Sequence, residues 1–358
     1  MSPLPKVYIV ILNWKGWRDT IECLESVLRL DYENFVVIVC DNNSGDGSLE
    51  KIQSWANGHL LATCSNRELR SFSFPPIPKP LPARVVNPGE HLTFSGCSER
   101  LFLIQTGSNL GFAAGNNVGL RMALESGDLE FAWLLNNDTV VHPNALRSLV
   151  SRMEHRPDAG ICGATLLHYT QPEVVQALAG SAYNQWTARV SHVGAGLDRS
   201  RTPSLDWVES RLSYVSGASM FLRRAFLEQV GLMCEDYILY FEEIDWVSRS
   251  GKRFSLCYSP ESFVYHKEGA SIGTSGSSMT RSSRSEFYAS RGRLLFTRRY
   301  YPAAFTSVLC SLLLSIAQRC FLGNWKGAAA CLHGTIRGIL DFRHTVAGAH
   351  ASVDKSWP

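Results

Sequence analysis

The 358-residue sequence contains ten cysteines but no two of them in a Cys-x-x-Cys pair. Zinc ribbons and thioredoxin-like redox sites use such pairs, so neither class is supported. Several cysteines, such as Cys40 in FVVIVC, lie in apolar runs where a free thiol packs as a small hydrophobic group. This cysteine usage favours a reducing compartment. An excess of charge of one sign is also lacking, because the net charge is only +3, and no nucleic-acid partner is expected.

Two sequence signals are missing as well. The segment GSNLGFAAGNN has glycines at 107, 111 and 115, which is not the GxGxxG spacing of a dinucleotide-binding Rossmann fingerprint. Glycines at the start of a helix still permit close backbone approach to a ligand. The N-terminal residues MSPLPKVYIVIL lack the basic region and the small-residue cleavage site of a signal peptide, which predicts a cytoplasmic location.

What the sequence does contain is a regular alternation of apolar segments in its first 150 residues. An apolar fraction of 45% and a charged fraction of 19% are typical of an ordered globular protein. Strands are expected at 6–14, 35–40, 100–106 and 131–135, and helices at 20–30, 49–56, 112–126 and 142–157. This alternation predicts an α/β fold with a mostly parallel sheet and helices on both faces.

The remaining segments are less regular. Residues 59–99 include the proline-dense FSFPPIPKPLP and are expected to form an extended insertion, either a tolerated loop or a gating or partner-binding element. The segment 253–266 predicts two short strands around Pro260, and the Ser/Gly-rich segment 269–283 predicts a mobile loop. We therefore expect a main domain over 1–270, a mobile loop and basic helix over 271–300, and C-terminal amphipathic helices over 301–358.

The segment 302–318 carries no charge and is at the short limit for crossing a bilayer. Its larger apolar side chains share one helical face: Phe305, Val308, Leu309, Leu312, Leu313 and Ile316. A one-sided stripe favours a helix that lies on a membrane or packs on the core over one that spans lipid. The arginine-rich stretch 281–299 before it is either a solvated helix face or a contact for anionic lipid or phosphate. We expect peripheral binding to the inner face of the cytoplasmic membrane.

Two polar clusters directly follow expected strands, where open parallel sheets bind ligands. In DNNSGDGS, Asp41 could accept hydrogen bonds from a nucleobase or ribose, or the segment could be only a turn and helix cap. In LLNNDTVV, a polar trio that ends at Asp138 interrupts an apolar run. Mg²⁺ and Mn²⁺ prefer carboxylate oxygens together with substrate phosphates, so Asp138 is a candidate metal ligand; the alternative is a turn into the helix near Pro143.

A third cluster, YFEEIDW at 240–246, places Glu242, Glu243 and Asp245 within four positions among aromatic residues. Charges so close repel each other, and partial burial increases that cost. The stretch is either a first helical turn favoured by the helix dipole or a place where one carboxylate is held for proton chemistry. Asp245 lies four residues before Arg249, which predicts an intrahelical ion pair.

Together these segments resemble glycosyltransferase family 2, the inverting enzymes with a GT-A fold, over roughly residues 6–300. The matching pieces occur in the family's order: VYIVILNW, CDNNSGDGS, GSNLGFAAGNN, LLNNDTVV, SGASMFLRRAFLEQVG, YFEEIDW and VYHKEGAS. The likeness is to rhamnosyltransferase-type members that act on bacterial cell-envelope polysaccharides. It implies a Rossmann-like nucleotide-binding half and an acceptor half, to which the expected C-terminal helices are added.

The resemblance also implies roles for individual residues. Asp41 would contact the nucleoside of a nucleotide-sugar, within a donor-binding set made up of Asn13, Asp41, Asn43, Asn109, Gly111, Asn116 and Asn137. Asn136 stands at the first acidic place of the family's Asp-x-Asp metal motif, and Asp138 at the last. His266 matches a histidine that completes the metal or diphosphate site in several relatives. A Mg²⁺ or Mn²⁺ cofactor follows from this match.

In the family, the second member of the acidic pair that begins a helix is the catalytic base, which maps onto Glu243 with Glu242 beside it. A base within hydrogen-bond reach can take the proton of a sugar hydroxyl as it attacks. The expected reaction transfers a sugar, with rhamnose as the candidate, from a nucleoside-diphosphate sugar to a saccharide or polyprenyl-linked saccharide.

Two alternatives are a nucleotidyltransferase and a non-catalytic protein that binds a nucleotide-sugar or lipid. The first normally has a Gly-rich basic phosphate loop after its first strand, where this chain has LNWKGWRDT.

Overall fold

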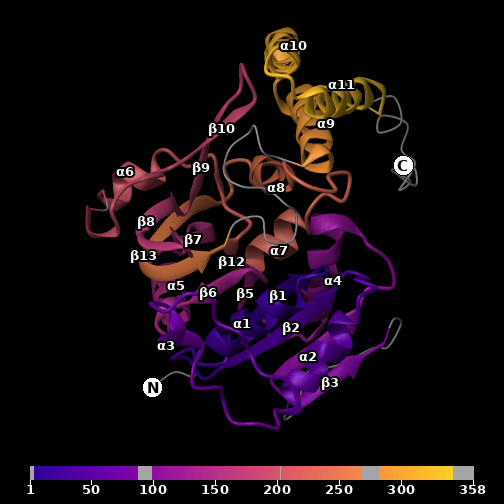
Figure 1. Cartoon of the computed structure of the whole chain (residues 1–358). Coiled ribbons are helices and arrows are strands. Elements are labelled where there is room, and N and C mark those ends of the chain that lie inside the picture. The colour runs from indigo at the N-terminus through magenta and orange to yellow at the C-terminus, as the bar shows by residue number, and fades with distance from the viewer. Residues whose placement is uncertain (1–3, 88–98, 202, 268–281, 342–358) are drawn as a thin grey trace.

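The computed structural model describes residues 4–87, 99–201, 203–267 and 282–341. Its centre is a ten-stranded sheet with the order β3-β4-β2-β1-β5-β12-β7-β13-β6, and β8 pairs with β7 outside this path (Figure 1). The strands of this sheet are β1 (Val7–Asn13), β2 (Phe35–Asp41), β3 (Ala83–Val86), β4 (Leu101–Gln105), β5 (Phe131–Asn136), β6 (Thr139–Val141), β7 (Ala159–His168), β8 (Gln171–Leu178), β12 (Ser219–Arg223) and β13 (Ser255–His266). A smaller sheet holds β10 (Arg189–His192), β9 (Gly180–Asn184) and β11 (Tyr214–Val215).

All neighbouring strands from β3 to β5 run parallel, and β7 and β13 run parallel to each other. β12 is inserted antiparallel between β5 and β7, and β6 pairs antiparallel with β13. The expected mostly parallel sheet is therefore confirmed, with antiparallel strands in its second half.

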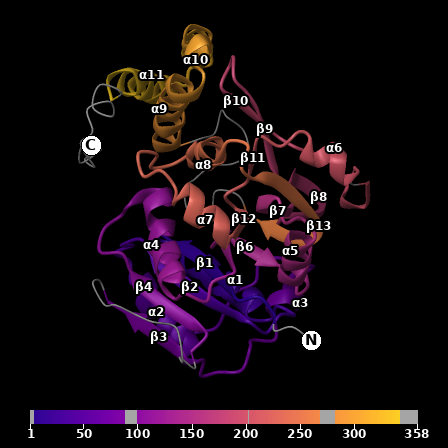
Figure 2. The same cartoon turned by 180° about the vertical axis from the view of Figure 1, so that it is seen from behind.

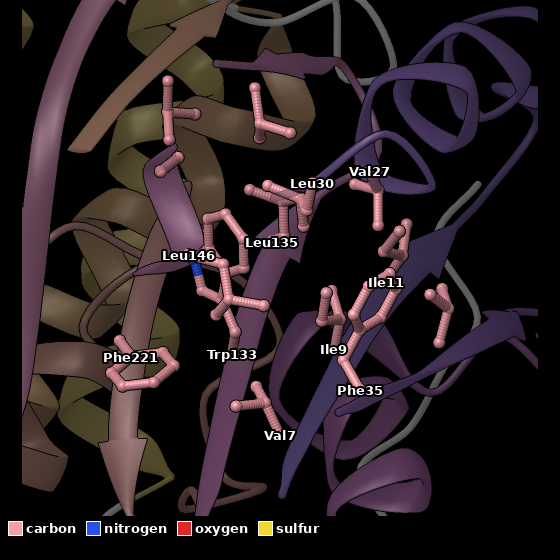
Figure 3. Packing of buried hydrophobic residues seen from close by; sticks show 14 of the residues in the cluster. Val7, Ile9, Ile11, Val27, Leu30, Phe35, Trp133, Leu135, Leu146 and Phe221 are labelled. Atoms are coloured by element: carbon pink, nitrogen blue, oxygen red, sulfur yellow. The ribbon is translucent and has the colours of Figure 1, made fainter. Parts of the chain in front are cut away.

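Helices cover both faces of this sheet. They are α1 (Trp17–Val27), α2 (Ser48–Ala56), α3 (Arg70–Ser73), α4 (Gly111–Glu125), α5 (Ala145–Glu154), α6 (Leu205–Glu209), α7 (Arg224–Val230) and α8 (Glu242–Ser250), with a 3₁₀ turn at Arg199–Arg201. Alternate residues of β1 serve the two faces: Val7, Ile9 and Ile11 pack with α1, α2 and α5, whereas Tyr8 and Val10 pack with α4 and α7. Figure 3 shows the first of these cores. Strands buried on both faces need continuous apolar runs, which is why β1 and β2 are visible in the sequence.

The proline-rich insertion is attached to the main domain by a buried carboxylate. Glu25 of α1 accepts hydrogen bonds from the Trp55 indole, the Ile77 amide and the Lys79 ammonium group, each at 2.9 Å. The insertion then adds β3 as an edge strand parallel to β4. Its gating or partner role remains a proposal, and residues 88–98 lie outside the described part of the chain.

The segment 253–266 differs from expectation. It forms one strand, β13, rather than two, so that prediction was wrong. Its pairing with β7 shifts register between Ser259 and Phe263, around Pro260. Proline has no amide hydrogen to donate to the ladder, so it interrupts the pairing locally without ending the strand.

Three helices follow at the C-terminal side: α9 (Ser283–Tyr300), α10 (Phe305–Phe321) and α11 (Trp325–Leu340), with a 3₁₀ turn at Pro302–Ala304. In both views they stand at the end of the molecule farthest from β3, and α8 lies between them and the sheet (Figures 1 and 2). Most of the expected mobile loop, residues 268–281, lies outside the described residues. Two arginines of the basic stretch form ion pairs within the protein: Arg291 pairs with Asp341, and Arg299 pairs with Asp236.

The helix expected from the apolar stripe packs by one side only. Val308 and Leu312 are fully buried against Leu294 and Cys331 of α9 and α11. Leu313, which belongs to the apolar stripe, and Leu314 are exposed. Residues Pro302–Phe321 are long and apolar enough to cross a membrane by length and composition; an 18-residue window of this helix has a mean hydropathy of 1.5 and is 28% buried.

Candidate active site

Polar side chains gather where the parallel strands end. Asn13 of β1 pairs in register with Asp41 of β2, and Asp41 pairs with Gln105 of β4. On the other side, Leu12 of β1 pairs with Asn136 of β5. One edge of the sheet therefore carries the ends of four neighbouring strands, as expected for a ligand site in an open parallel sheet.

Asp41 is buried and its carboxylate is saturated with donors. Oδ1 accepts from Asn13 Nδ2 at 2.6 Å and from the Ser44 hydroxyl at 2.5 Å. Oδ2 accepts from the Ser44 amide and from Gln105 Nε2, both at 3.1 Å. Asp41 therefore serves the turn that follows β2, which was one of its two expected roles, and its contact with a nucleoside stays a prediction.

Asn137 joins the same network. Its amide donates to Thr20 Oγ1 at 3.0 Å and to Asn13 Oδ1 at 3.5 Å, and Thr20 donates to Asn13 Oδ1 at 2.8 Å. The structure thus brings together Asn13, Asp41 and Asn137, as the donor-site prediction requires. Sequence reasoning missed Thr20, Ser44 and Gln105, although the position of Gln105 at the end of a strand was an available signal.

The glycine-rich segment is held by Asn42, which was not predicted either. Its amide donates to Asn109 Oδ1 and to the Gly111 carbonyl, both at 3.1 Å, and its Oδ1 accepts from the Leu110 amide at 2.9 Å. Gly111 has φ +82°, and a Cβ there would lie 2.7 Å from the Ile238 carbonyl. The close approach that this glycine permits is to the protein's own backbone.

Two residues that were predicted to bind the nucleotide-sugar lie outside this network. Asn116 is buried and donates to the Phe112 carbonyl of its own helix at 3.0 Å. Asn43 is exposed in the turn after β2, with φ +54°. Their predicted contacts with the nucleotide-sugar stay untested.

Asp138 and His266 meet because β6 and β13 pair antiparallel, with His266 opposite Thr139. His266 Nε2 lies 3.2 Å from Asp138 Oδ1 and 3.5 Å from Asn136 Nδ2. The other ring nitrogen, Nδ1, lies 2.9 Å from Gln176 Oε1 of β8. A histidine that ligates a metal commonly has its second nitrogen oriented in this way.

The electrostatics around Asp138 favour its charged form. Burial alone would raise the pKa of this carboxyl, but the charge of His266 and its hydrogen bond outweigh burial and hold the pKa below its ordinary value. The charge of Lys267 lowers the pKa further. The Lys267 amide donates to the Asp138 carbonyl at 3.0 Å, and its ammonium group pairs with Asp19 and Glu22. Asp138 is therefore a carboxylate near neutral pH.

This pair fits a divalent cation that also binds substrate phosphates. Across the described ranges, no group of three or more His, Cys, Asp or Glu side chains lies close enough to hold an ion. Mg²⁺ commonly takes one or two carboxylates and completes its shell with substrate phosphates and water. Asp138 supplies one such carboxylate, and His266 and Asn136 lie beside it.

The acidic pair of α8 has the opposite character. Glu242 is 2% exposed, and its Oε2 has no hydrogen-bond partner among the described residues. Burial raises the pKa of both glutamates, and the charge of Glu243 raises the pKa of Glu242 further, well above its usual range. We infer that Glu243 ionises first and that Glu242 stays protonated beside it. The predicted ion pair of Asp245 with Arg249 is confirmed, with 2.8 Å between Oδ2 and Nε.

Glu243 points toward the start of β12. Its Oε1 lies 2.7 Å from the position that a Cβ on Gly217 would occupy, so only glycine leaves room for it there. The next residue, Ala218, accepts a hydrogen bond from the Asn136 amide at 3.1 Å, and Asn136 adjoins His266. Glu243 and the Asp138–His266 pair therefore both lie near Asn136, at the edge of the sheet where β5 ends and β12 begins.

Comparison with known proteins identifies the class. The description "Glycosyltransferase like family 2" matches residues 94–285, and "Glycosyl transferase family 2" matches residues 7–69. Because these matches cover more than half of the chain, it belongs to glycosyltransferase family 2.

Two curated relatives are more specific. The chain is 25% identical over 194 residues to an N-acetylglucosaminyl-diphospho-decaprenol L-rhamnosyltransferase of Mycobacterium tuberculosis, across 48% of this chain and 60% of that protein. It is also 25% identical over 158 residues to a low-salt glycan biosynthesis hexosyltransferase of Haloferax volcanii, across 43% of this chain and 48% of that protein. The chain thus matches less than two thirds of the length of either relative.

Two solved structures share the fold. A mannosyltransferase of Pyrobaculum calidifontis in complex with GDP-Man and Mn²⁺ aligns with a TM-score of 0.51 at 12% identity, over 95% of this chain and 88% of that one. GalNAc-T7 with UDP, GalNAc and Mn²⁺ aligns with a TM-score of 0.51 at 12% identity, over 83% and 48%. The fold is that of the GT-A glycosyltransferases, as the sequence resemblance implied.

Proposed function

We propose that this glycosyltransferase is inverting and metal-dependent, and that it moves a sugar from a nucleoside-diphosphate sugar to a hydroxyl of a saccharide or lipid-linked saccharide. Rhamnose is the proposed sugar and cell-envelope polysaccharide synthesis the proposed role, because the Mycobacterium tuberculosis relative is named a rhamnosyltransferase. The observation that carries the proposal is the shared sheet edge of Glu243 and the Asp138–His266 pair.

On the donor side, Asp138 and His266 would hold a Mg²⁺ or Mn²⁺ ion. Such an ion offsets the charge that develops on a departing nucleoside diphosphate. Gln176 fixes the ring of His266, and Asn13, Asp41 and Asn137 shape the adjoining strand ends for the nucleoside. Both solved structures described above contain Mn²⁺, which supports this assignment.

On the acceptor side, Glu243 would act as general base. Its carboxylate takes the proton of the attacking hydroxyl while the new bond forms between that oxygen and the anomeric carbon. The bond from the anomeric carbon to the diphosphate oxygen breaks on the opposite face, so the configuration inverts. Glu242 is expected to stay neutral beside it, because a second charge would raise the energy of the ionised base.

The location proposed is the inner face of the cytoplasmic membrane, reached through α10 and α11. Leu314, Phe321 and Trp325 are 70%, 91% and 67% exposed, and Lys326 and Arg337 are exposed on α11. Exposed apolar residues with neighbouring basic ones suit an anionic lipid surface. Such a surface would present a polyprenyl-linked acceptor, the kind of substrate that the name of the Mycobacterium tuberculosis relative prints.

A donor screen tests the central proposal. Purified protein is melted with nucleoside-diphosphate sugars, including deoxythymidine-diphosphate rhamnose, with and without Mn²⁺, and each stabilising compound is then assayed for turnover. We expect one donor to stabilise the protein only when Mn²⁺ is present, and slow hydrolysis of that donor to be stimulated by the metal. Stabilisation without turnover would instead favour the non-catalytic binding protein.

The membrane assignment has a separate test. A triple variant, Leu314→Gln with Phe321→Gln and Trp325→Gln, should no longer sediment with vesicles that contain phosphatidylglycerol, while its donor binding is unchanged. Leu61→Gln is the matched control, since Leu61 is 71% exposed but lies in the insertion. Equal sedimentation of the triple variant and the wild type would reject membrane binding through these helices.

A further inference from the structure

The turn that leads into α8 has an unusual backbone. Tyr240 and Phe241 have φ values of +68° and +72°, in the left-handed region that aromatic residues rarely adopt. Glu242 and Glu243 follow immediately. A pair of such residues persists only where the surrounding packing holds it, and functional sites are common places for it.

The packing that holds this turn comes from α9. A Cβ on Gly292 would lie 2.7 Å from Cδ2 of the Phe241 ring, a distance that real side chains do not show. The same ring lies against Phe296 of α9, with 5.7 Å between ring centroids. The ring therefore sits directly on the α9 backbone at the one residue that has no side chain to displace it.

A second attachment joins the two helices one turn further along α8. Asp245 is fully buried, and its Oδ1 accepts from Arg299 Nη1 at 3.0 Å and from the Tyr300 hydroxyl at 2.9 Å. Both partners belong to α9. α9 thus contacts α8 on each side of Glu243, through Phe241 before it and Asp245 after it.

We propose that Gly292 is a positioning residue for Glu243. By seating the Phe241 ring on α9, it fixes the left-handed turn, and this turn sets the direction in which the first turn of α8 presents Glu243 toward Gly217. The inference rests on the proposed role of Glu243 as base. It gives α9 a part in the acceptor half of the reaction and none in donor binding.

The direct test is Gly292→Ala, which pushes the ring away. We expect kcat for metal-stimulated donor turnover to fall at least about tenfold, because small misplacements of a catalytic group have large effects on rate. The KM for the donor and the Mn²⁺-dependent thermal shift should stay within about twofold. Phe241→Leu in the same chain, whose methyl groups can turn away from α9, should restore kcat to within about threefold.

A matched control separates positioning from general destabilisation. A Cβ on Gly160 would lie 2.6 Å from Cδ2 of Phe226, a clash of the same kind, but Gly160 lies at the start of β7, the far end of that strand from the site. Gly160→Ala should lower the melting temperature and leave kcat nearly unchanged. If both alanine variants lose kcat in proportion to lost stability, or if Gly292→Ala loses donor binding, the proposal is overturned.

Two further measurements keep the proposal testable if Gly292→Ala folds poorly or turnover is slow. Tyr300→Phe keeps the ring and removes only the hydroxyl that donates to Asp245. It should lower kcat about threefold at unchanged donor KM. An unchanged kcat would count against a role for the contact between α9 and Asp245. Hydrogen exchange of residues 240–246 should accelerate in Gly292→Ala and recover in the double variant, whatever the turnover. Unaltered exchange there would also overturn the proposal.

The outcomes distinguish this inference from the proposed function. If Glu243→Gln keeps wild-type turnover, Glu243 is not the base and the proposed function fails. If Glu243→Gln is inactive while Gly292→Ala is fully active, only the positioning role fails.

Discussion

Asp138 and Glu242 are both buried carboxyl groups, yet their surroundings shift the pKa in opposite directions. Asp138 has a histidine ring against its carboxylate and a lysine beside it, and its pKa is lowered. Glu242 has another carboxyl as its neighbour and an oxygen without a partner, and its pKa is raised. Burial raises the pKa of either group, so the neighbouring charge decides which one carries a charge. The surroundings of Asp138 keep its carboxylate charged, whereas Glu242 and Glu243 carry one negative charge between them.

The largest expected effect comes from removing the charge on the base side. Glu243→Gln should lower transfer by about 10²–10⁴-fold, the usual contribution of a general base, with Mn²⁺-dependent donor binding unchanged. Initial rates and a donor thermal shift measured on the same preparation check both parts. A variant that transfers normally would remove the functional difference between the two sites.

Removing the charge on the donor side should affect binding first. Asp138→Asn keeps the shape and deletes the charge opposite His266, so Mn²⁺-dependent donor binding should weaken by about 100-fold. Asp158→Asn is the control. Asp158 pairs with Arg156 just before β7 begins, and the candidate site lies near the opposite end of β7. If Asp138→Asn and Glu243→Gln failed identically at donor binding, the division between the two sites would be wrong.

A smaller effect is expected from changing Gln176, which contacts His266 rather than the proposed metal ion. Gln176→Ala removes the partner of His266 Nδ1 and should raise the Mn²⁺ concentration needed for half-maximal turnover about tenfold. Gln171→Ala, an exposed glutamine on the same strand, should leave it unchanged. Equal Mn²⁺ requirements in both variants would show that the orientation of His266 does not depend on Gln176.

The smallest expected effect is on the pH dependence of protein stability. Because the folded pKa of Glu242 lies above its unfolded value, wild-type stability falls as the pH rises from the unfolded pKa toward the folded one. Glu242→Gln resembles the neutral acid and avoids that loss. It should therefore be more stable at pH 7.5 by about 1 kcal/mol or more, roughly 2 °C in Tm, and should retain transfer.

The gain in Glu242→Gln should shrink as the pH is lowered toward and below 4.5, where the unfolded glutamate becomes protonated as well. Melting curves across this range check the sign. A variant less stable than the wild type at pH 7.5 would mean that Glu242 is charged in the folded protein.

The first half of the fold was predictable because its strands are buried on both faces and its helices repeat at regular spacing. β1, β2, β4 and β5 appear where the apolar runs placed them. The antiparallel insertion of β12 was not predictable, since strand order depends on long-range pairing. β13 shows the same limit: Pro260 indicated a break, but pairing with β7 carries the strand past it.

The site divides in a similar way. The polar residues at strand ends could be found from the sequence, because each interrupts an apolar run. Their partners could not: Gln105 meets Asp41 only because β4 lies beside β2, and Gln176 meets His266 only because β8 and β13 both pair with β7. The placement of His266 beside Asp138 followed from the family resemblance, since no local spacing connects them.

The attachment of α9 has a consequence for building chimeric enzymes. Arg291 and Arg298 of α9 bond to Asp341 and the Ile339 carbonyl at the end of α11, while Arg299 bonds to Asp245 of α8. A crossover placed between α8 and α9 would therefore divide side chains that bond to each other between two parents. Recombination with another family member should exchange α8 through α11 as one block, with the junction in the loop before Tyr237 rather than between α8 and α9.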